Sequence, residues 1–133
     1  VSKIFIPKEY NFDLLFNALY KFKDIIKYKK YENNYDYNKA VYIMSQFNVL
    51  ENGFVMLKED ESFASPIATL FYEKYDDEIA LFEKLESSKE NIQCIISNLE
   101  KNEFINFGDS QNPKLWDYAD GVDTLAFLSN SNF

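Results

Sequence analysis

Residues 58–73 pass from a charged segment to an apolar one, and this change restricts the folds that the chain can adopt. Lys58-Glu59-Asp60-Glu61 comes first, and the apolar run Ile67–Tyr72 follows Ser65-Pro66. The run is rich in β-branched and aromatic residues and therefore predicts a β-strand, which tolerates proline at its first position. Open α/β sheets bind ligands at the polar loops beside strand ends. The loop that carries Glu61 and Phe63 is therefore the first candidate for a functional site.

The rest of the chain predicts alternating strands and helices, in the order β-α-α-β-β-α-β-β with a C-terminal tail. We expect strands at 2–6, 54–57, 67–72, 92–97 and 104–107, and helices at 12–29, 37–47 and 77–88. Asn11, Asp36 and Asp76 are the expected N-caps, and Asn52-Gly53 is an expected turn. The strand, helix and strand within 67–97 predict a right-handed crossover between parallel strands. The expected fold is a three-layer α/β domain with a mostly parallel sheet flanked by helices.

Length and charge exclude several classes of function. The chain has 133 residues, the size of one domain, and its 14 basic and 22 acidic residues give a formal net charge of -8. This charge argues against binding to a nucleic-acid backbone, which requires clustered basic residues. We find no apolar run of transmembrane length and no signal peptide, and one cysteine cannot form an internal disulfide, so we expect a cytoplasmic protein. Because Val1 opens in a predicted strand without an initiator Met, we expect a single domain excised from a longer chain.

Several kinds of catalytic and metal site are also excluded. The chain has no histidine, so it lacks Ser-His-Asp and Cys-His catalysis and imidazole zinc sites. Cys94 lies within a predicted apolar strand, and we expect it to pack inertly in the core. Four residues near the C-terminus suggest a calcium site, because three of them are acidic. Their spacing does not match an EF-hand loop, so we expect them to form turns and cap a helix instead. These residues are Asp117, Asp120, Gly121 and Asp123.

Two groups of residues leave a structural and a binding role open. Glu59, Asp60 and Glu61 form a like-charged cluster, which composition alone assigns to a solvated loop. Alternatively, one carboxylate accepts hydrogen bonds from a ligand's hydroxyls, as acidic residues hold a ribose, while Phe63 packs on a flat ring. A tyrosine-rich segment predicts first an aromatic cluster where helix packs on helix, and second a binding surface. Its members are Tyr28, Tyr31, Tyr35, Tyr37 and Tyr42.

The block 58–97 resembles the C-terminal half of the aldehyde dehydrogenase catalytic domain. Glu61-Ser62-Phe63-Ala64-Ser65-Pro66 is similar to the superfamily's Glu-x-Phe-Gly-Pro, with Ala64-Ser65 in place of the single glycine. In that superfamily the motif precedes a strand, an acidic helix start, a helix and a buried strand. Ile105-Asn106-Phe107-Gly108 is similar to Pro-Phe-Gly-Gly, with Asp109 in place of the second glycine. Val1 to Pro7 resembles the strand that follows the superfamily's catalytic cysteine.

A closer resemblance is to the bioluminescence-type fatty acyl-CoA reductases, and it covers essentially the whole chain. It rests on Asn33-Asn34-Tyr35-Asp36-Tyr37-Asn38-Lys39 and on Leu115-Trp116-Asp117-Tyr118-Ala119-Asp120-Gly121-Val122-Asp123-Thr124. The resemblance implies NADPH-dependent reduction of a fatty acyl-CoA to a fatty aldehyde through a cysteine acyl-enzyme. That cysteine and the nucleotide-binding domain would lie upstream of Val1. The resemblance therefore implies a catalytic subdomain that is inactive alone, with a homo-oligomer as the family expectation.

The same resemblance implies roles for individual residues. Glu61 would bind the nicotinamide ribose, with Glu59 as its rival, Phe63 would pack against the nicotinamide ring, and Phe107 would line the acyl path. These roles require Glu61 and Phe63 to lie near the amino end of the first strand. The alternative function is a stand-alone acidic interaction module without catalytic activity, whose tyrosine-rich helices form the contact face.

Overall fold

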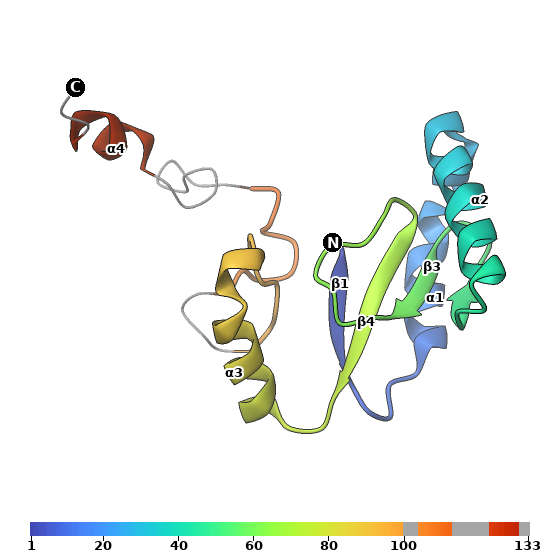
Figure 1. Cartoon of the computed structure of the whole chain (residues 1–133), viewed down its shortest axis with the longest axis horizontal. Coiled ribbons are helices and arrows are strands. Elements are labelled where there is room, and N and C mark those ends of the chain that lie inside the picture. The colour runs from blue at the N-terminus through green and yellow to red at the C-terminus, as the bar shows by residue number, and fades with distance from the viewer. Residues whose placement is uncertain (100–103, 113–122, 131–133) are drawn as a thin grey trace. The chain divides into compact units, whose positions relative to one another are not determined.

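The structure, a computed structural model, describes residues 1–99, 104–112 and 123–130 (Figure 1). The chain divides into two compact units, Val1–Lys84 and Leu85–Phe133. The elements are β1 (Lys3–Pro7), α1 (Phe12–Leu19), the 3₁₀ helix η1 (Tyr20–Lys27), α2 (Lys29–Met44), β2 (Val49–Glu51), β3 (Met56–Glu59), β4 (Thr69–Tyr75), α3 (Glu78–Ser87), the 3₁₀ helix η2 (Lys89–Asn91) and α4 (Thr124–Asn130). None of the described helices is long and apolar enough to cross a membrane.

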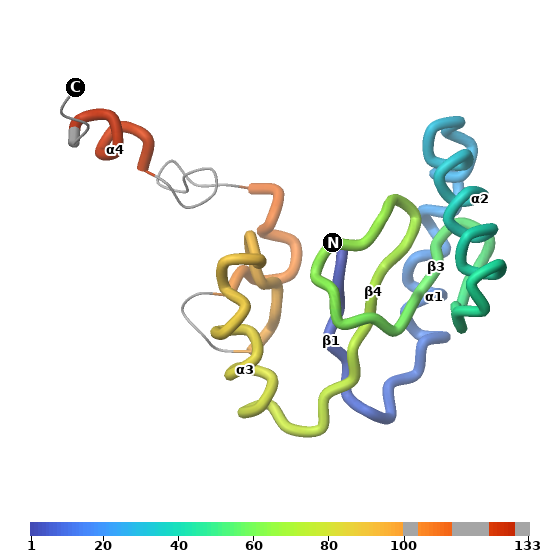
Figure 2. The backbone as a smooth tube through the Cα atoms, in the orientation of Figure 1, coloured from blue at the N-terminus to red at the C-terminus, as the bar shows by residue number. Residues whose placement is uncertain are grey.

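The first unit is built on a four-stranded sheet in the order β1-β4-β3-β2. β4 lies between β1 and β3 and pairs in parallel with both, whereas β2 pairs with β3 in the antiparallel direction. Figure 2 follows the backbone through these strands. The register sets Lys3 opposite Phe71 and Phe5 opposite Glu73. The predicted α/β class with a mostly parallel sheet is confirmed at this level.

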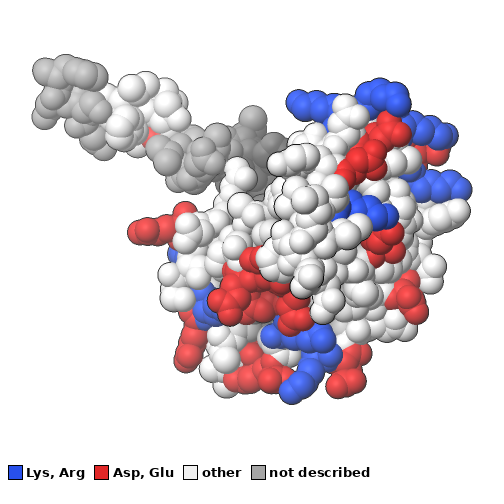
Figure 3. Space-filling model, turned by 45° about the vertical axis from the view of Figure 1, so that its right-hand side comes forward, with Lys and Arg blue, Asp and Glu red and all other residues white. Residues whose placement is uncertain are grey.

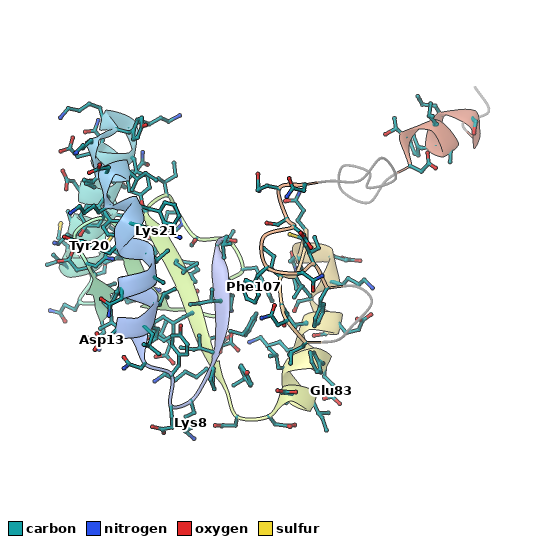
Figure 4. The ribbon with its side chains drawn as sticks, turned by 180° about the vertical axis from the view of Figure 1, so that it is seen from behind. Lys8, Asp13, Tyr20, Lys21, Glu83 and Phe107 are labelled. Atoms are coloured by element: carbon teal, nitrogen blue, oxygen red, sulfur yellow. The ribbon has the colours of Figure 1, made fainter. Side chains whose placement is uncertain are left out.

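Helices cover both faces of the sheet. Consecutive strand residues point to opposite faces, so neighbouring residues of β3 pack against different helices. Met56 is fully buried and packs with Tyr35 and Tyr42 of α2. Its neighbour Leu57, also fully buried, belongs to a second cluster with Ile6 and Tyr72, against which α1 packs through Phe12, Leu15 and Phe16. Figure 4, seen from behind, shows α1 in front of the sheet. The sheet is therefore the shared support of two apolar cores.

The second helix begins earlier than the sequence predicts. Asn11 caps α1 as expected, since its side chain accepts a hydrogen bond from the Asp13 N–H at 2.9 Å. However, the predicted helix 12–29 is an α-helix only to Leu19 and then a 3₁₀ helix, and the predicted break 32–35 is helical. Asp36 lies inside α2 and does not cap it. The prediction failed because α2 is polar in composition and buries Tyr35, Asn38 and Tyr42, which a search for aliphatic periodicity passes over.

The strands after α2 also differ from the prediction. Gly53 has φ +91°, which confirms a turn at Asn52-Gly53, but the turn joins a hairpin whose first strand, β2, was not predicted. β3 is Met56–Glu59 rather than 54–57. β4 starts at Thr69, because the Thr69 N–H donates to the Pro66 carbonyl at 3.1 Å and thereby closes a turn. Pro66 therefore lies in a turn and is not the first residue of the strand.

Residues 92–97 do not form the predicted buried strand. They contribute only an isolated parallel bridge, between Ile96 and Ile105, and they belong to no strand of the sheet. The predicted strand 104–107 is likewise reduced to that bridge, and the crossover predicted within 67–97 is wrong. The helix within it, α3, is confirmed, although Asp77 rather than Asp76 accepts the first-turn N–H, that of Ala80.

α4 accounts for one of the residues considered for calcium. Asp123 Oδ1 accepts a hydrogen bond from the Ala126 N–H at 2.9 Å, so its carboxylate caps this helix, as the capping interpretation predicts. Asp117, Asp120 and Gly121 lie outside the described residues.

Candidate functional site

The candidate site is the loop 60–68, which connects the parallel strands β3 and β4. This loop contacts β1 near its amino end. The Lys3 ammonium donates to the Glu61 backbone carbonyl at 2.7 Å and lies 4.9 Å from the Phe63 ring centroid. The Phe5 and Phe63 rings are 6.3 Å apart, centroid to centroid. Glu61 and Phe63 thus lie beside the amino end of the first strand, the position that their expected roles require.

Lys3 also forms an ion pair with Glu73 of β4. Its side chain is only 4% exposed, and the ammonium pairs with Glu73 Oε2 at 2.6 Å. Glu73 has a second partner, Lys84 of α3, at its other carboxylate oxygen. Burial raises the pKa of the Glu73 carboxyl, but hydrogen bonds from Lys3 and Lys84 outweigh burial and hold this pKa below its ordinary value. Glu73 is therefore a carboxylate shared by two ammonium groups.

A second lysine fixes the start of the loop. Lys58, at the end of β3, pairs with Asp60 Oδ2, and its ammonium lies 4.5 Å from the Phe47 ring centroid and 5.3 Å from that of Phe71. Asp60 Oδ1 accepts from the Ser62 N–H at 2.9 Å. The hydrogen bond from Lys58 and then that from the Ser62 backbone lower the pKa of Asp60 to about 2. Asp60 is thus a structural residue of the loop, and its carboxylate is already satisfied within the chain.

The two rival carboxylates for ribose binding have different surroundings. The Glu61 side chain is exposed to solvent, while its backbone is held by Lys3. Glu59, also exposed, accepts a hydrogen bond from the Tyr72 hydroxyl at 3.4 Å. Burial and the neighbouring Glu59 charge both raise the pKa of Tyr72. Glu61 is therefore the carboxylate that offers more of its hydrogen-bonding capacity to a ligand.

A small cavity borders Glu73 but does not include the loop. Its volume is about 250 Å³, below the roughly 300–1,000 Å³ typical of ligand pockets. Among its lining residues are Phe5, Glu73, Leu81 and Lys84. Neither Glu61 nor Phe63 lines it, so a ligand held by these two residues would lie over the loop rather than in this cavity.

Two other predicted residues lie outside the loop. Phe107 is 68% exposed in the second unit, in the turn that follows Ile105 (Figure 4), and its role stays a prediction. Cys94 is exposed, so the expectation of core packing is wrong. The apolar residues around it predicted a buried strand, but the segment forms no sheet strand that would bury it. In the described ranges, no group of three His, Cys, Asp or Glu residues is arranged to hold a metal ion.

The tyrosine-rich segment is divided between core and surface. Tyr35 and Tyr42 are buried against the sheet, and the Tyr31 hydroxyl donates to the Phe54 carbonyl at 2.8 Å. The expected aromatic cluster is present: Tyr35 and Tyr42 of α2 pack both with Met56 of the sheet and with Ile26 of the neighbouring η1. Tyr28 and Tyr37 are 72% and 69% exposed. Since the buried tyrosines are not accessible, the proposed tyrosine contact face loses its central members.

Charged side chains do not form a single continuous basic surface on the described part of the face in Figure 3, where lysines stand beside acidic residues. By contrast with Lys3, Lys8 just after β1 is exposed and pairs with Asp76 at 3.2 Å (Figure 4). Such an exposed pair contributes little to stability.

Sequence reasoning missed Lys3 and Lys58 as site residues. Each interrupts a predominantly apolar segment, Ile4-Phe5-Ile6 after Lys3 and Val55-Met56-Leu57 before Lys58. A lysine in such a segment signals a buried ammonium that needs a partner, because an unpaired buried charge is costly.

By fold and site, the chain is a small mixed α/β domain in which the loop between two parallel strands is fixed on a third strand. Comparisons with protein-family models, with curated proteins and with solved structures give no match.

Proposed function

We propose that this chain is the cofactor-side part of the catalytic domain of an NADPH-dependent fatty acyl-CoA reductase. A cysteine thiolate upstream of Val1 attacks the thioester carbonyl, a new thioester forms, and CoA leaves as its thiolate. When bound, NADPH would supply a hydride to the carbonyl of this thioester; cleavage of the C–S bond would then release the aldehyde, and a proton from solvent would restore the cysteine thiol. Cys94 has no role in this proposal.

The observation that carries the proposal is the contact of the Glu61–Phe63 loop with the amino end of β1. The reaction requires the hydride donor to lie close to the thioester. A cysteine just before β1 would emerge beside this loop, because Lys3 holds the Glu61 carbonyl and Phe5 lies beside Phe63. The order of the motif, the strand β4 and the acidic start of α3 at Glu78 also supports the resemblance.

The residues present fit a nicotinamide nucleotide in their chemistry. The exposed Glu61 carboxylate can accept hydrogen bonds from ribose hydroxyls, which is how acidic residues hold a ribose. Phe63 is half-buried, so its ring has a supported face and an accessible part, as a residue that packs against a flat ring requires. We assign Glu61 to the ribose and Phe63 to the nicotinamide.

The test is Phe63→Ala in the full-length protein. We expect the NADPH-dependent formation of aldehyde to fall by about tenfold or more, the loss expected for one aromatic contact that positions a reacting group. The rate of acylation by a labelled fatty acyl-CoA should change by less than about twofold, because the loop does not supply the nucleophile. Single-turnover kinetics measure the two steps separately.

Two variants serve as controls. Phe22→Ala removes a phenyl ring that is 57% exposed on η1, away from the loop, and should leave both steps unchanged. Cys94→Ser should also retain both steps, and loss of the acyl-enzyme in that variant would identify Cys94 as the nucleophile. Unchanged reduction in Phe63→Ala would contradict the proposed function.

A further inference from the structure

We propose that Lys3 is a positioning residue that holds the Glu61–Phe63 loop in place for the cofactor. The proposal deepens the proposed function and rests on it for the identity of the ligand. Lys3 makes no contact with a reacting atom in this proposal. It acts through the backbone of Glu61 and the ring of Phe63, the two residues assigned to the nucleotide.

The geometry of Lys3 joins three parts of the first unit. From β1, its ammonium reaches the Glu61 carbonyl at 2.7 Å and the Glu73 carboxylate of β4 at 2.6 Å. The same nitrogen lies 4.9 Å from the centroids of both Phe5 and Phe63. One cation therefore connects the loop to the two parallel strands and lies close to the rings of Phe5 and Phe63.

Because the Lys3 side chain is buried, its ammonium depends on the hydrogen bond to the Glu61 carbonyl. A lysine side chain that is 4% exposed cannot obtain its hydrogen bonds from bulk water, so its donors depend on acceptors within the protein. One of these acceptors is the loop carbonyl. Displacement of the loop would leave the buried ammonium with one fewer acceptor. The position of the loop and the charge of Lys3 are thus coupled.

This coupling leaves the Glu61 side chain free for a ligand. Lys3 contacts the backbone oxygen of Glu61, not its carboxylate, so the loop is fixed while the carboxylate stays exposed. Preorganisation of this kind lowers the cost of binding, since the loop does not have to be ordered by the ligand. Removal of Lys3 should therefore weaken NADPH binding without affecting the acylation step.

The experiment uses Lys3→Met in the full-length protein, with KM and kcat for NADPH and the acylation rate measured separately. We expect the KM for NADPH to rise about tenfold or more, the effect of losing a hydrogen bond to a charged group. The acylation rate should change by less than about twofold. Lys3→Arg should recover most of the loss, because a guanidinium can donate to both the carbonyl and the carboxylate.

Lys84→Met is the matched control. Lys84 donates to the same Glu73 carboxylate but comes from α3, so its removal disturbs the ion pair without removing the contact to the Glu61 carbonyl. Lys84→Met should leave the KM for NADPH within about twofold of the parent value. An equal rise in Lys84→Met and Lys3→Met would overturn the proposal, because the effect would then come from Glu73 and not from the loop.

If Lys3→Met fails to fold, Lys3→Met/Glu73→Gln removes both charges of the pair and still deletes the donor to the loop. Hydrogen–deuterium exchange of free protein gives a readout that does not depend on activity. Amides of residues 62–64 should exchange about tenfold faster in this variant, while the Leu57 amide in β3 is unchanged. If the variant shows this faster exchange but the full-length wild-type protein does not reduce acyl-CoA, the proposed function is contradicted and Lys3 remains the loop's positioning residue. Unchanged exchange and unchanged KM would overturn the positioning role.

Discussion

Lys58 and Asp60 form a compact electrostatic unit at the start of the candidate loop. The Lys58 side chain is 10% exposed and that of Asp60 is 22% exposed, and three aromatic rings lie near the ammonium. Asp60 also accepts the Ser62 N–H, so its charge stabilises both the lysine and the first turn of the loop. The ionised form of Asp60 is therefore favoured in the folded protein.

Asp60→Asn should show how much the Asp60 charge contributes to the free energy of unfolding, and this contribution should depend on pH. The pKa of Asp60 is about 2 in the folded protein, against an ordinary value of 3.8. A lowered folded-state pKa gives stability that is fully present above pH 4 and is lost as the pH falls through about 2. We expect Asp60→Asn to reduce the free energy of unfolding by about 1–2 kcal/mol at pH 7. The difference from wild type should narrow between pH 4 and pH 2 in urea denaturation.

Glu9→Gln provides the comparison, because Glu9 is an exposed carboxylate outside the loop. Its free energy of unfolding should differ from that of wild type by less than about 0.5 kcal/mol at pH 7. A constant difference between wild type and Asp60→Asn across the acid range would show that the carboxylate charge is not the cause.

Part of the candidate site could be predicted from single residues. A charged loop before an apolar run predicts Glu61 and Phe63 as site residues, but that pattern does not report their position beside β1, which only the fold supplies. Lys3 was not identified, because its partners are distant in sequence and only the pairing of β1 with β4 brings them together. Cys94 shows the opposite error: its apolar neighbours indicated burial, but no further strand pairs with its segment among the described residues.

At the scale of elements, the C-terminus of α2 has a defined capping motif. The Gln46 N–H donates to the Ile43 carbonyl at 3.1 Å and the Phe47 N–H to the Tyr42 carbonyl at 3.0 Å. Gln46 has φ 57°, so it occupies the left-handed position of a Schellman motif, where glycine is preferred. This helix end is therefore formed at a conformational cost.

Gln46→Gly should raise the free energy of unfolding by about 1 kcal/mol, because glycine adopts positive φ without the clash of a Cβ atom. Thermal or urea denaturation measures the change. Ser45→Gly is the control: Ser45 has φ -84°, where glycine gains nothing, and we expect a loss of about 0.5 kcal/mol. Equal effects of the two substitutions would contradict the assignment.

The same scale shows which elements local patterns could predict. β1, the start of α1 and α3 were predicted within a few residues, because a cap or a proline marks each of them. α2 and β2 were not, because α2 buries tyrosines and Asn38 in a polar sequence and β2 is only three residues long. The apolar run Ile92–Ile96 predicted a strand, but a strand also requires a partner, which local sequence does not report.

At the scale of the whole molecule, the two units differ in backbone pairing. Val1–Lys84 contains all four strands of the sheet, whereas the described part of Leu85–Phe133 contains one isolated bridge. Amides within continuous β-ladders exchange through openings that cost nearly the global free energy of unfolding. Amides outside such ladders exchange through local openings that cost less free energy.

Hydrogen exchange should therefore separate the two units in the wild-type protein. We expect the amides of β3 and β4 to exchange at least about a hundredfold more slowly than those of residues 92–94, a difference of roughly 3 kcal/mol in opening free energy. Mass spectrometry of proteolytic fragments measures both groups in one experiment. Equal protection would show that the second unit is stabilised as strongly as the sheet.

The contact between Lys3 and the loop joins residues 58 positions apart, and the ion pair with Glu73 joins residues 70 positions apart. Contacts of such large sequence separation form only after the entropy of closing the intervening chain has been overcome. On a growing polypeptide, β1 is synthesised before β4, the strand with which it pairs in the described sheet. We therefore expect the loop to reach its final position only after β4 has joined β1, so that the surface proposed to bind the cofactor forms late in folding.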